Sequence, residues 1–115
     1  MNSFEMTKLK KINIFDYKTP SGNIAETFDN LFSNNDLIIE RIVTHRSPED
    51  NDNWFDQKKN EWVILLSGKA VIEFENNEIT ELNTGDYIFI PAHKKHRVLS
   101  ASINPKCVWL GVHFK

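Results

Sequence analysis

Cysteine, glycine, proline and long apolar runs are all scarce in this chain of 115 residues. Its one cysteine, Cys107, cannot form an internal disulfide, so we expect a buried, inert thiol in a protein of the reducing cytoplasm. No apolar run approaches the length of a transmembrane helix, and the N-terminus lacks a signal-peptide pattern, so no membrane partner is expected. The 4 Gly and 4 Pro exclude a collagen-like or disordered chain.

The chain also lacks an excess of basic charge. Its 14 Lys and Arg residues stand against 16 Asp and Glu, which gives a formal net charge of -2. Nucleic-acid-binding domains usually present a basic surface, so we expect no nucleic-acid partner. The length predicts a single domain over residues 1–115, and 40% hydrophobic residues are typical of a globular protein.

What the sequence does contain is a series of short β-type runs separated by turn signals. No segment is suited to a helical crossover between parallel strands, so we predict antiparallel sheets in an all-β sandwich, jelly roll or small barrel. The segment 24–32 fits either a helical stripe or an edge strand, and we favour a strand or short turn there. The other predicted strands cover residues 36–44, 61–66, 70–74, 78–82, 86–90, 96–100 and 106–114.

Two segments carry a recognisable motif. Glu61 begins the apolar run EWVILL and precedes Gly68 by six intervening residues, while Gly85, Pro91 and His96 follow at fixed spacing. This pattern resembles the cupin family, whose first motif reads His-x-His, three or four residues, Glu, six residues, Gly. The second family motif reads Gly, five residues, Pro-x-Gly, two residues, His. The resemblance implies an antiparallel double-stranded β-helix, that is, a cupin-like jelly-roll barrel, and it suggests a homodimer.

The resemblance covers residues 36–114 but departs from the family in the first motif. The two family histidines fall on Trp54 and Asp56 with the longer spacing, or on Phe55 and Gln57 with the shorter one. Both alignments stay open. Asp56 and Gln57 are neighbours on one short extended segment, so their side chains should face opposite ways.

The resemblance implies a divalent metal ion in the barrel, with Fe, Mn, Ni or Zn as candidates. His93 replaces the glycine of the second family motif and adds a possible ligand beside His96. An alternative is that both histidines flank a turn without binding metal. The candidate ligands are Asp56, Gln57, Glu61, His93 and His96.

Glu61 is the candidate catalytic residue. At period two it shares a strand face with Val63 and Leu65, which would direct its carboxyl group into the barrel. A carboxylate in a core is costly unless it is paired or binds a metal ion. Glu61, or Asp56, could then move protons on a substrate.

Three further residues are candidates for substrate binding. Lys95 and Arg97, with Lys94 beside them, could attract an anionic small molecule, although solvated side chains at a turn are the commoner case. Trp54 could line an apolar pocket. For His45 and His113 a structural role is favoured, and their function stays open.

Three functions follow from these features. The first is a metal-dependent enzyme acting on a small, possibly anionic molecule, such as an isomerase, dioxygenase or lyase. A non-catalytic barrel that binds or senses a small ligand ranks closely behind, because the first motif is degraded. A dimeric accessory protein with a vestigial site ranks third, with the EWVILL strand at the subunit interface.

Overall fold

The computed structural model describes residues 9–49 and 54–115, and strands dominate this part of the chain. All predicted strands are confirmed to within two residues at their ends, and the ambiguous segment is a strand. One short 3-10 helix, Glu75–Asn77, joins β4 to β5. The strands are β1 Glu26–Ser33, β2 Leu37–Thr44, β3 Asn60–Ser67, β4 Lys69–Phe74, β5 Glu78–Asn83, β6 Tyr87–Ile90, β7 His96–Ala101 and β8 Cys107–Phe114.

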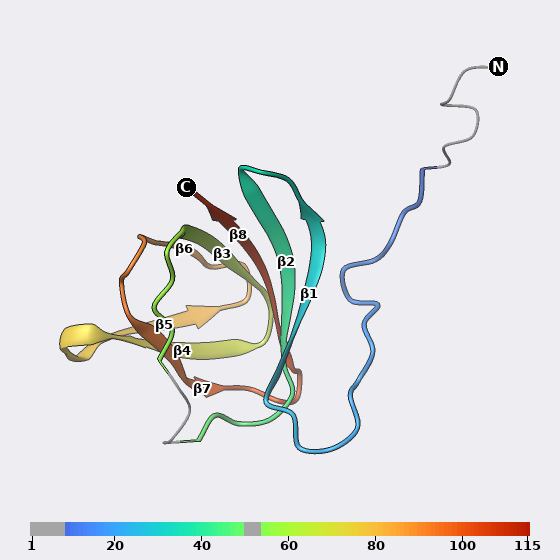
Figure 1. The fold of residues 1–115 in the computed structure, drawn as a ribbon. Coiled ribbons are helices and arrows are strands. Elements are labelled where there is room, and N and C mark those ends of the chain that lie inside the picture. Colours follow the sequence, from blue (N-terminus) through green and yellow to red (C-terminus); the bar gives the residue numbers. More distant parts are fainter. Residues whose placement is uncertain (1–8, 50–53) are drawn as a thin grey trace.

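The strands form two antiparallel sheets, with the orders β1-β2-β8-β3-β6 and β5-β4-β7 (Figure 1). Each pairing joins antiparallel neighbours, and β8, the last strand, lies between β2 and β3. Strands distant in the sequence are therefore neighbours in space, as in a jelly roll. The all-β jelly-roll class predicted from the sequence is confirmed.

The core lies between the inner faces of the two sheets. Glu61, Val63 and Leu65 are all buried on one face of β3, as the period-two pattern predicts. Cys107 is fully buried, as expected, and the inertness of its thiol stays a prediction. The buried core cluster comprises Ile42, Val63, Leu65, Ala70, Ile72, Phe74, Leu82, Ile90, Cys107 and Trp109.

Turns with positive φ connect the strands where the sequence predicts them. Asn76 and Asn77 adopt φ of 69° and 62° between β4 and β5, which asparagine tolerates better than most residues. Gly68, at φ 96°, has no room for a side chain, because a Cβ atom there would lie 2.8 Å from Cys107 Sγ. This glycine therefore lets β3 turn directly into β4 over the buried thiol.

The chain that precedes β1 runs as an extended segment without helix or strand over its described residues (Figure 1). Buried Arg41 of β2 anchors it by donating hydrogen bonds to the carbonyl oxygens of Ile14 and Asp16, both at 3.1 Å. Arg41 also pairs with Asp29 at 2.9 Å.

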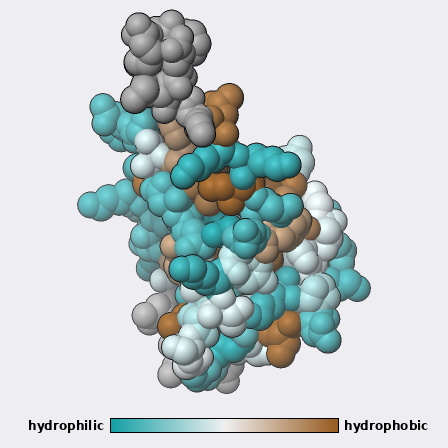
Figure 2. All heavy atoms as spheres, turned by 90° about the vertical axis from the view of Figure 1, so that its right-hand side faces the viewer, coloured by the Kyte–Doolittle hydropathy of each residue, from teal (hydrophilic) through white to brown (hydrophobic). Residues whose placement is uncertain are grey.

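Seen from the β1 side, the surface is mostly hydrophilic, with small apolar groups between the polar ones (Figure 2). In the described part of the chain, no helix is long and apolar enough to cross a membrane.

Candidate functional site

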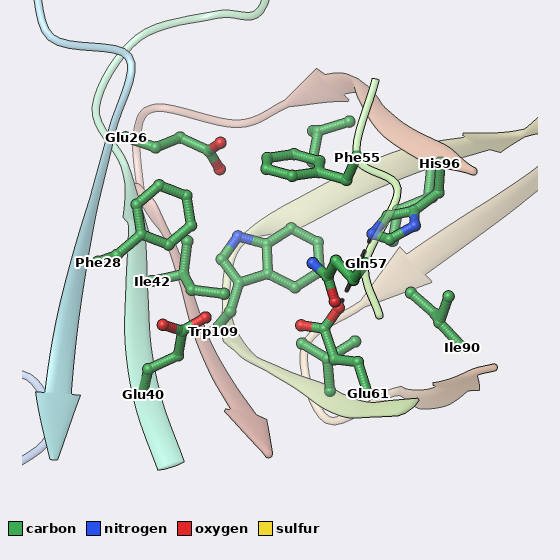
Figure 3. A pocket seen from close by; sticks show the side chains of 13 residues that line it. Glu26, Phe28, Glu40, Ile42, Phe55, Gln57, Glu61, Ile90, His96 and Trp109 are labelled. Carbon is green, nitrogen blue, oxygen red and sulfur yellow. Dashed lines mark ion pairs between the residues drawn. The ribbon is translucent and has the colours of Figure 1, made fainter. Parts of the chain in front are cut away.

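A cavity of about 50 Å³ opens into the barrel between the sheets. Figure 3 shows side chains from several strands and from the segment before β3 around this space. Dry cavities of about 150 Å³ hold benzene, so this cavity suits water or a ligand of a few non-hydrogen atoms. Its lining comprises Glu26, Phe28, Glu40, Ile42, Phe55, Gln57, Glu61, Val63, Ile72, Ile90, His96, Val98 and Trp109.

Glu61 and His96 face each other in this cavity, with Glu61 Oε1 3.8 Å from His96 Nε2. Both residues are almost completely buried, at 4% and 6% exposure. The Nδ1–H of His96 donates to the carbonyl oxygen of Lys94 at 3.0 Å, which leaves Nε2 to face Glu61. Burial raises the pKa of the Glu61 carboxyl and lowers the pKa of the His96 imidazole. Both shifts favour the uncharged forms, a protonated Glu61 carboxyl and a neutral His96 imidazole.

A second carboxylate–imidazole pair lies beside Glu61. His113 is its direct cross-strand partner between β3 and β8, with His113 Nε2 3.7 Å from Glu61 Oε2. The same Nε2 donates to Glu40 Oε1 at 2.7 Å, and this hydrogen bond raises the pKa of His113. Gly111 makes room for the arrangement, because a Cβ atom there would lie 3.1 Å from Glu61 Oε2.

Sequence reasoning missed Glu40 and left His113 without a function. The available signal was the alternation of side chains along a strand. Glu40 is a charged residue in an apolar β-branched run and lies on the same strand face as Ile42. This alternation alone could not show which face of β2 or β8 turns inward. Glu26 and Phe28 were missed as lining residues for the same reason.

The first motif follows the shorter of the two alignments. Phe55 and Gln57 line the cavity, whereas Asp56 points away from it, which confirms that neighbouring side chains face opposite ways. The Phe55 ring stacks on the His96 ring, with centroids 5.6 Å apart. Burial raises the pKa of the Glu61 carboxyl, and the Gln57 side chain acts in the opposite direction.

Asp56 and His93 meet outside the cavity. Asp56 Oδ1 lies 3.1 Å from His93 Nδ1, and both side chains are largely exposed. His93 adopts φ of 64°, the left-handed conformation that explains why the family motif has glycine at this position. Its backbone N–H donates to the carbonyl oxygen of Gln57 at 2.7 Å, which ties the turn to the segment carrying the first motif.

The predicted substrate-binding residues also lie outside the cavity lining. The Arg97 guanidinium stacks over the Trp54 ring at 4.7 Å and pairs with Glu73 at 2.8 Å. Lys95 is exposed beside Trp54 and Asp56 on the outer surface. Arg97 and Trp54 border a second hollow, which shares Glu26, Phe28, Phe55 and Val98 with the cavity. Arg97 and Trp54 therefore lie near the entrance to the cavity. The role of Lys95, Arg97 and Trp54 in substrate binding stays a prediction.

The side chains at the motif positions do not form a complete set of ligands for the metal ion that the family resemblance implies. Glu61 and His96 meet in the cavity, but Gln57 contributes a weak amide ligand and Phe55 none. Within the described part of the chain, no group of three or more His, Cys, Asp or Glu side chains is arranged to hold a metal ion. At the motif positions, one carboxylate, one imidazole and one amide do not make up a metal centre of three or four strong ligands.

Comparison with known proteins supports the fold assignment. The cupin domain family matches residues 47–113. A protein from Ralstonia eutropha JMP134, named as a proposed mannose-6-phosphate isomerase, is 34% identical, with 93% of this chain and 99% of that chain covered and a TM-score of 0.80. No curated protein matches the sequence significantly.

Two more distant structures share the fold. A cupin superfamily protein from Desulfitobacterium hafniense DCB-2 is 16% identical, covering 84% of this chain and 83% of that chain, with a TM-score of 0.65. Fe(II) HppE in complex with substrate is 19% identical, covering 76% and 52%, with a TM-score of 0.66. The family match extends over more than half of the sequence, and the Ralstonia relative covers nearly all of it. The chain therefore belongs to the cupin family.

Proposed function

We propose that the protein is an enzyme that moves a proton on a small molecule held in the barrel cavity. The observation that carries this proposal is the buried Glu61–His96 pair, 3.8 Å apart and facing the cavity. Burial shifts their pKa values in opposite directions, as is common for catalytic acid–base pairs.

The two residues have complementary roles in this proposal. Because its Nδ1–H is bonded to a backbone carbonyl, neutral His96 presents an unprotonated Nε2 that can accept a proton from the substrate. Protonated Glu61 can donate its proton to a substrate oxygen or nitrogen. An isomerase of this kind removes a proton from one atom of its substrate and adds a proton to another. The name of the Ralstonia relative supports that class.

The test compares Glu61→Gln and His96→Gln with the control His93→Gln, which changes an exposed imidazole outside the cavity. Turnover is measured by proton–deuterium exchange into aldoses, ketoses and their amino derivatives in D₂O. We expect each cavity variant to lose roughly 100-fold or more in kcat, the usual contribution of a general acid or base. Full activity of Glu61→Gln would contradict the proposal.

The metal-dependent enzyme that the family resemblance implies is a competing proposal, and it requires ligands beyond those that the motif positions supply. It is supported by Glu61 and His96 at two positions of the family motifs and by the Fe(II) form of the structural neighbour HppE. Elemental analysis of protein purified without an affinity tag or chelator tests it, with Glu61→Ala and His96→Ala as comparisons. Near-stoichiometric metal lost in both variants would support a metalloenzyme, and absence of metal after reconstitution with Fe(II), Mn, Ni and Zn would exclude it.

A non-catalytic barrel that binds or senses a ligand is the alternative. The observation in its favour is Phe55, which covers the His96 ring at a position where the family motif has a histidine. Ligand binding in the cavity without exchange or turnover would favour this alternative.

A further inference from the structure

The described chain begins with an arm, residues 9–16, that carries exposed apolar side chains. Leu9 is 97% exposed, Ile12 75% and Phe15 51%. Single apolar residues are common on protein surfaces, but three of them within one short arm form a concentrated apolar segment. In Figure 1 this arm lies beyond β1, on the side of the molecule away from β6. The body of its own chain therefore leaves most of this apolar surface in contact with water.

Strand β2 fixes where the arm begins its path away from the body. Arg41 of β2 donates to two main-chain carbonyl oxygens of the arm, both at 3.1 Å. Arg41 pairs in register with Leu110 of β8, which pairs with Ile64 of β3, one position from the inward-facing Val63. Because neighbouring side chains on a strand face opposite ways, Arg41 lies on the outer face of the five-stranded sheet. The arm is therefore anchored at one end of this outer face.

The other end of the same face carries exposed aromatic rings. Tyr87 and Phe89 of β6 pair in register with Ile64 and Trp62 of β3, so these four side chains share the outer face. The Phe89 ring also lies 6.2 Å from the ring of Phe114 on β8, between centroids. Tyr87 and Phe89 are both exposed, so the arm of the same chain leaves them uncovered.

A second copy of the chain can bring these two ends of the face together. Two-fold symmetric dimers use the same surface patch on both subunits. The sheet order is β1-β2-β8-β3-β6, so a two-fold axis along the central strand β8 places β2 of one copy opposite β6 of the other. The arm anchored on β2 of one copy then meets Tyr87 and Phe89 of the other copy, twice in one dimer.

The charges of the arm and of the surface beside the aromatic rings are complementary. Two exposed lysines, Lys10 and Lys11, separate the apolar residues of the arm. Tyr87 borders a hollow that Glu81 and Asp86 also line, and both acidic residues are exposed. Opposite charges at the rim of an interface guide association and orientation more than they add affinity. They favour this arm as the segment that meets β6.

We propose that the protein forms a dimer in which each copy lays residues 9–16 across Tyr87 and Phe89 of the other copy. One contact then covers the apolar arm and the aromatic end of the sheet together. It lies on the outer face of the sheet, so it is independent of the chemistry proposed for the cavity.

The first test removes the apolar side chains of the arm in the full-length chain. Leu9→Ser/Ile12→Ser changes two exposed residues, so the fold of the single subunit is kept. We expect the dimer dissociation constant to rise at least about tenfold, because an Ile and a Leu side chain in each arm lose their burial. Sedimentation equilibrium measures it. Ile79→Ser/Leu99→Ser is the matched control, since it changes an exposed Ile and an exposed Leu on the other sheet and should dimerise like the wild type.

The second test locates the arm of one copy on the other. An unlabelled Ile12→Cys chain carrying a nitroxide is mixed with a ¹⁵N-labelled chain that carries none. The native Cys107 is fully buried, so the nitroxide attaches at position 12. We expect broadening of the Tyr87 and Phe89 backbone N–H resonances by NMR. A nitroxide at Ser100→Cys, on an exposed position of β7, is the control and should leave these resonances sharp.

Three results would overturn the exchanged arm. They are a monomeric wild type, a dimer that Leu9→Ser/Ile12→Ser does not weaken, and broadening at Tyr87 and Phe89 only when the ¹⁵N label and the nitroxide are on the same chain. The third result would mean that the arm folds back onto its own sheet. Any of the three leaves the proposed function of the cavity unchanged.

Discussion

Phe55 and Gln57 line the cavity beside Glu61 and His96, at the two positions where the cupin motif has histidines. Replacing them with histidine would therefore place three imidazoles and one carboxylate around one space. These are the ligand types that bind Zn²⁺ and related divalent ions. This barrel therefore lacks a complete set of metal ligands because of only two side chains, Phe55 and Gln57.

We therefore expect the double variant Phe55→His/Gln57→His to bind about one Zn²⁺ per chain and to gain thermal stability, because the ion binds the folded state. Isothermal titration calorimetry with ZnCl₂ measures the binding, and the melting temperature with and without EDTA measures the gain. The control is Trp54→His/Asp56→His, built on the other alignment. Equal Zn²⁺ binding by both double variants would show that the cavity geometry is not responsible.

The Glu40–His113 pair gives stability a defined pH dependence. Glu40 raises the pKa of His113 above its ordinary value of about 6.5, so the folded state holds this proton more tightly than the unfolded state. The stabilisation is fully present below about pH 6.5 and is lost as the pH rises through the raised pKa. Burial raises the pKa of the Glu61 carboxyl, so this group also lowers the stability of the fold as the pH rises above about 4.3. The lowered pKa of His96 acts oppositely, and its destabilisation appears as the pH falls below about 6.5.

His113→Gln removes this pair, together with the longer contact between His113 and Glu61. We expect the wild type to exceed this variant by about 1–3 kcal/mol in free energy of unfolding below pH 6.5, the contribution of a charge-assisted hydrogen bond. The difference should shrink at higher pH. Urea unfolding at a series of pH values measures it. A difference that is constant, or that grows with pH, would contradict the assigned ion pair.

At the scale of elements, the turn between β6 and β7 joins the two sheets and brings the second motif to the first. His93 holds the left-handed conformation in this turn at a cost of about 1–2 kcal/mol for a residue with a Cβ atom. Its contact with Asp56 is exposed and contributes little stability. Backbone hydrogen bonds from His93 and His96 hold the turn to the segment 55–57 instead.

We therefore expect His93→Gly to keep or raise the stability of the fold, by up to about 1 kcal/mol, because glycine adopts positive φ without steric cost. His93→Ala is the matched control, since it removes the same imidazole but keeps the Cβ atom. Thermal unfolding of both variants measures the difference. A less stable His93→Gly than His93→Ala would contradict the argument from conformation.

At the scale of the whole molecule, the outer face of the five-stranded sheet carries aromatic pairs from three strands. Trp62 and Tyr87 lie 5.2 Å apart between ring centroids, and Phe89 and Phe114 lie 6.2 Å apart. Tyr87 and Phe89 are exposed, at 62% and 55%. The homodimer implied by the cupin resemblance stays a prediction, and this face is its candidate interface because interface centres are enriched in aromatic residues.

We expect sedimentation equilibrium to give a dimer for the wild type and a monomer for Phe89→Glu, because a carboxylate at the centre of an apolar interface loses its hydration. Phe32→Glu is the control, since it changes an exposed phenylalanine on β1, at the far edge of the same sheet. A monomeric wild type, or a dimer unaffected by Phe89→Glu, would exclude this interface.

The sequence by itself determined the strands, the jelly-roll class and the positions of Glu61 and His96. Strand periodicity and turn residues are local properties, and the motif spacing reads directly along the chain. Glu61 was therefore placed correctly on the buried face with Val63 and Leu65.

The tertiary structure alone decided the remainder of the site. It placed Gln57 inward and Asp56 outward, and it brought Glu40 and His113 to Glu61 from β2 and β8. These contacts join residues as far apart as 73 positions in the sequence. Periodicity shows that two faces of a strand differ, but which face turns inward depends on the partner strands and on the closure of the barrel.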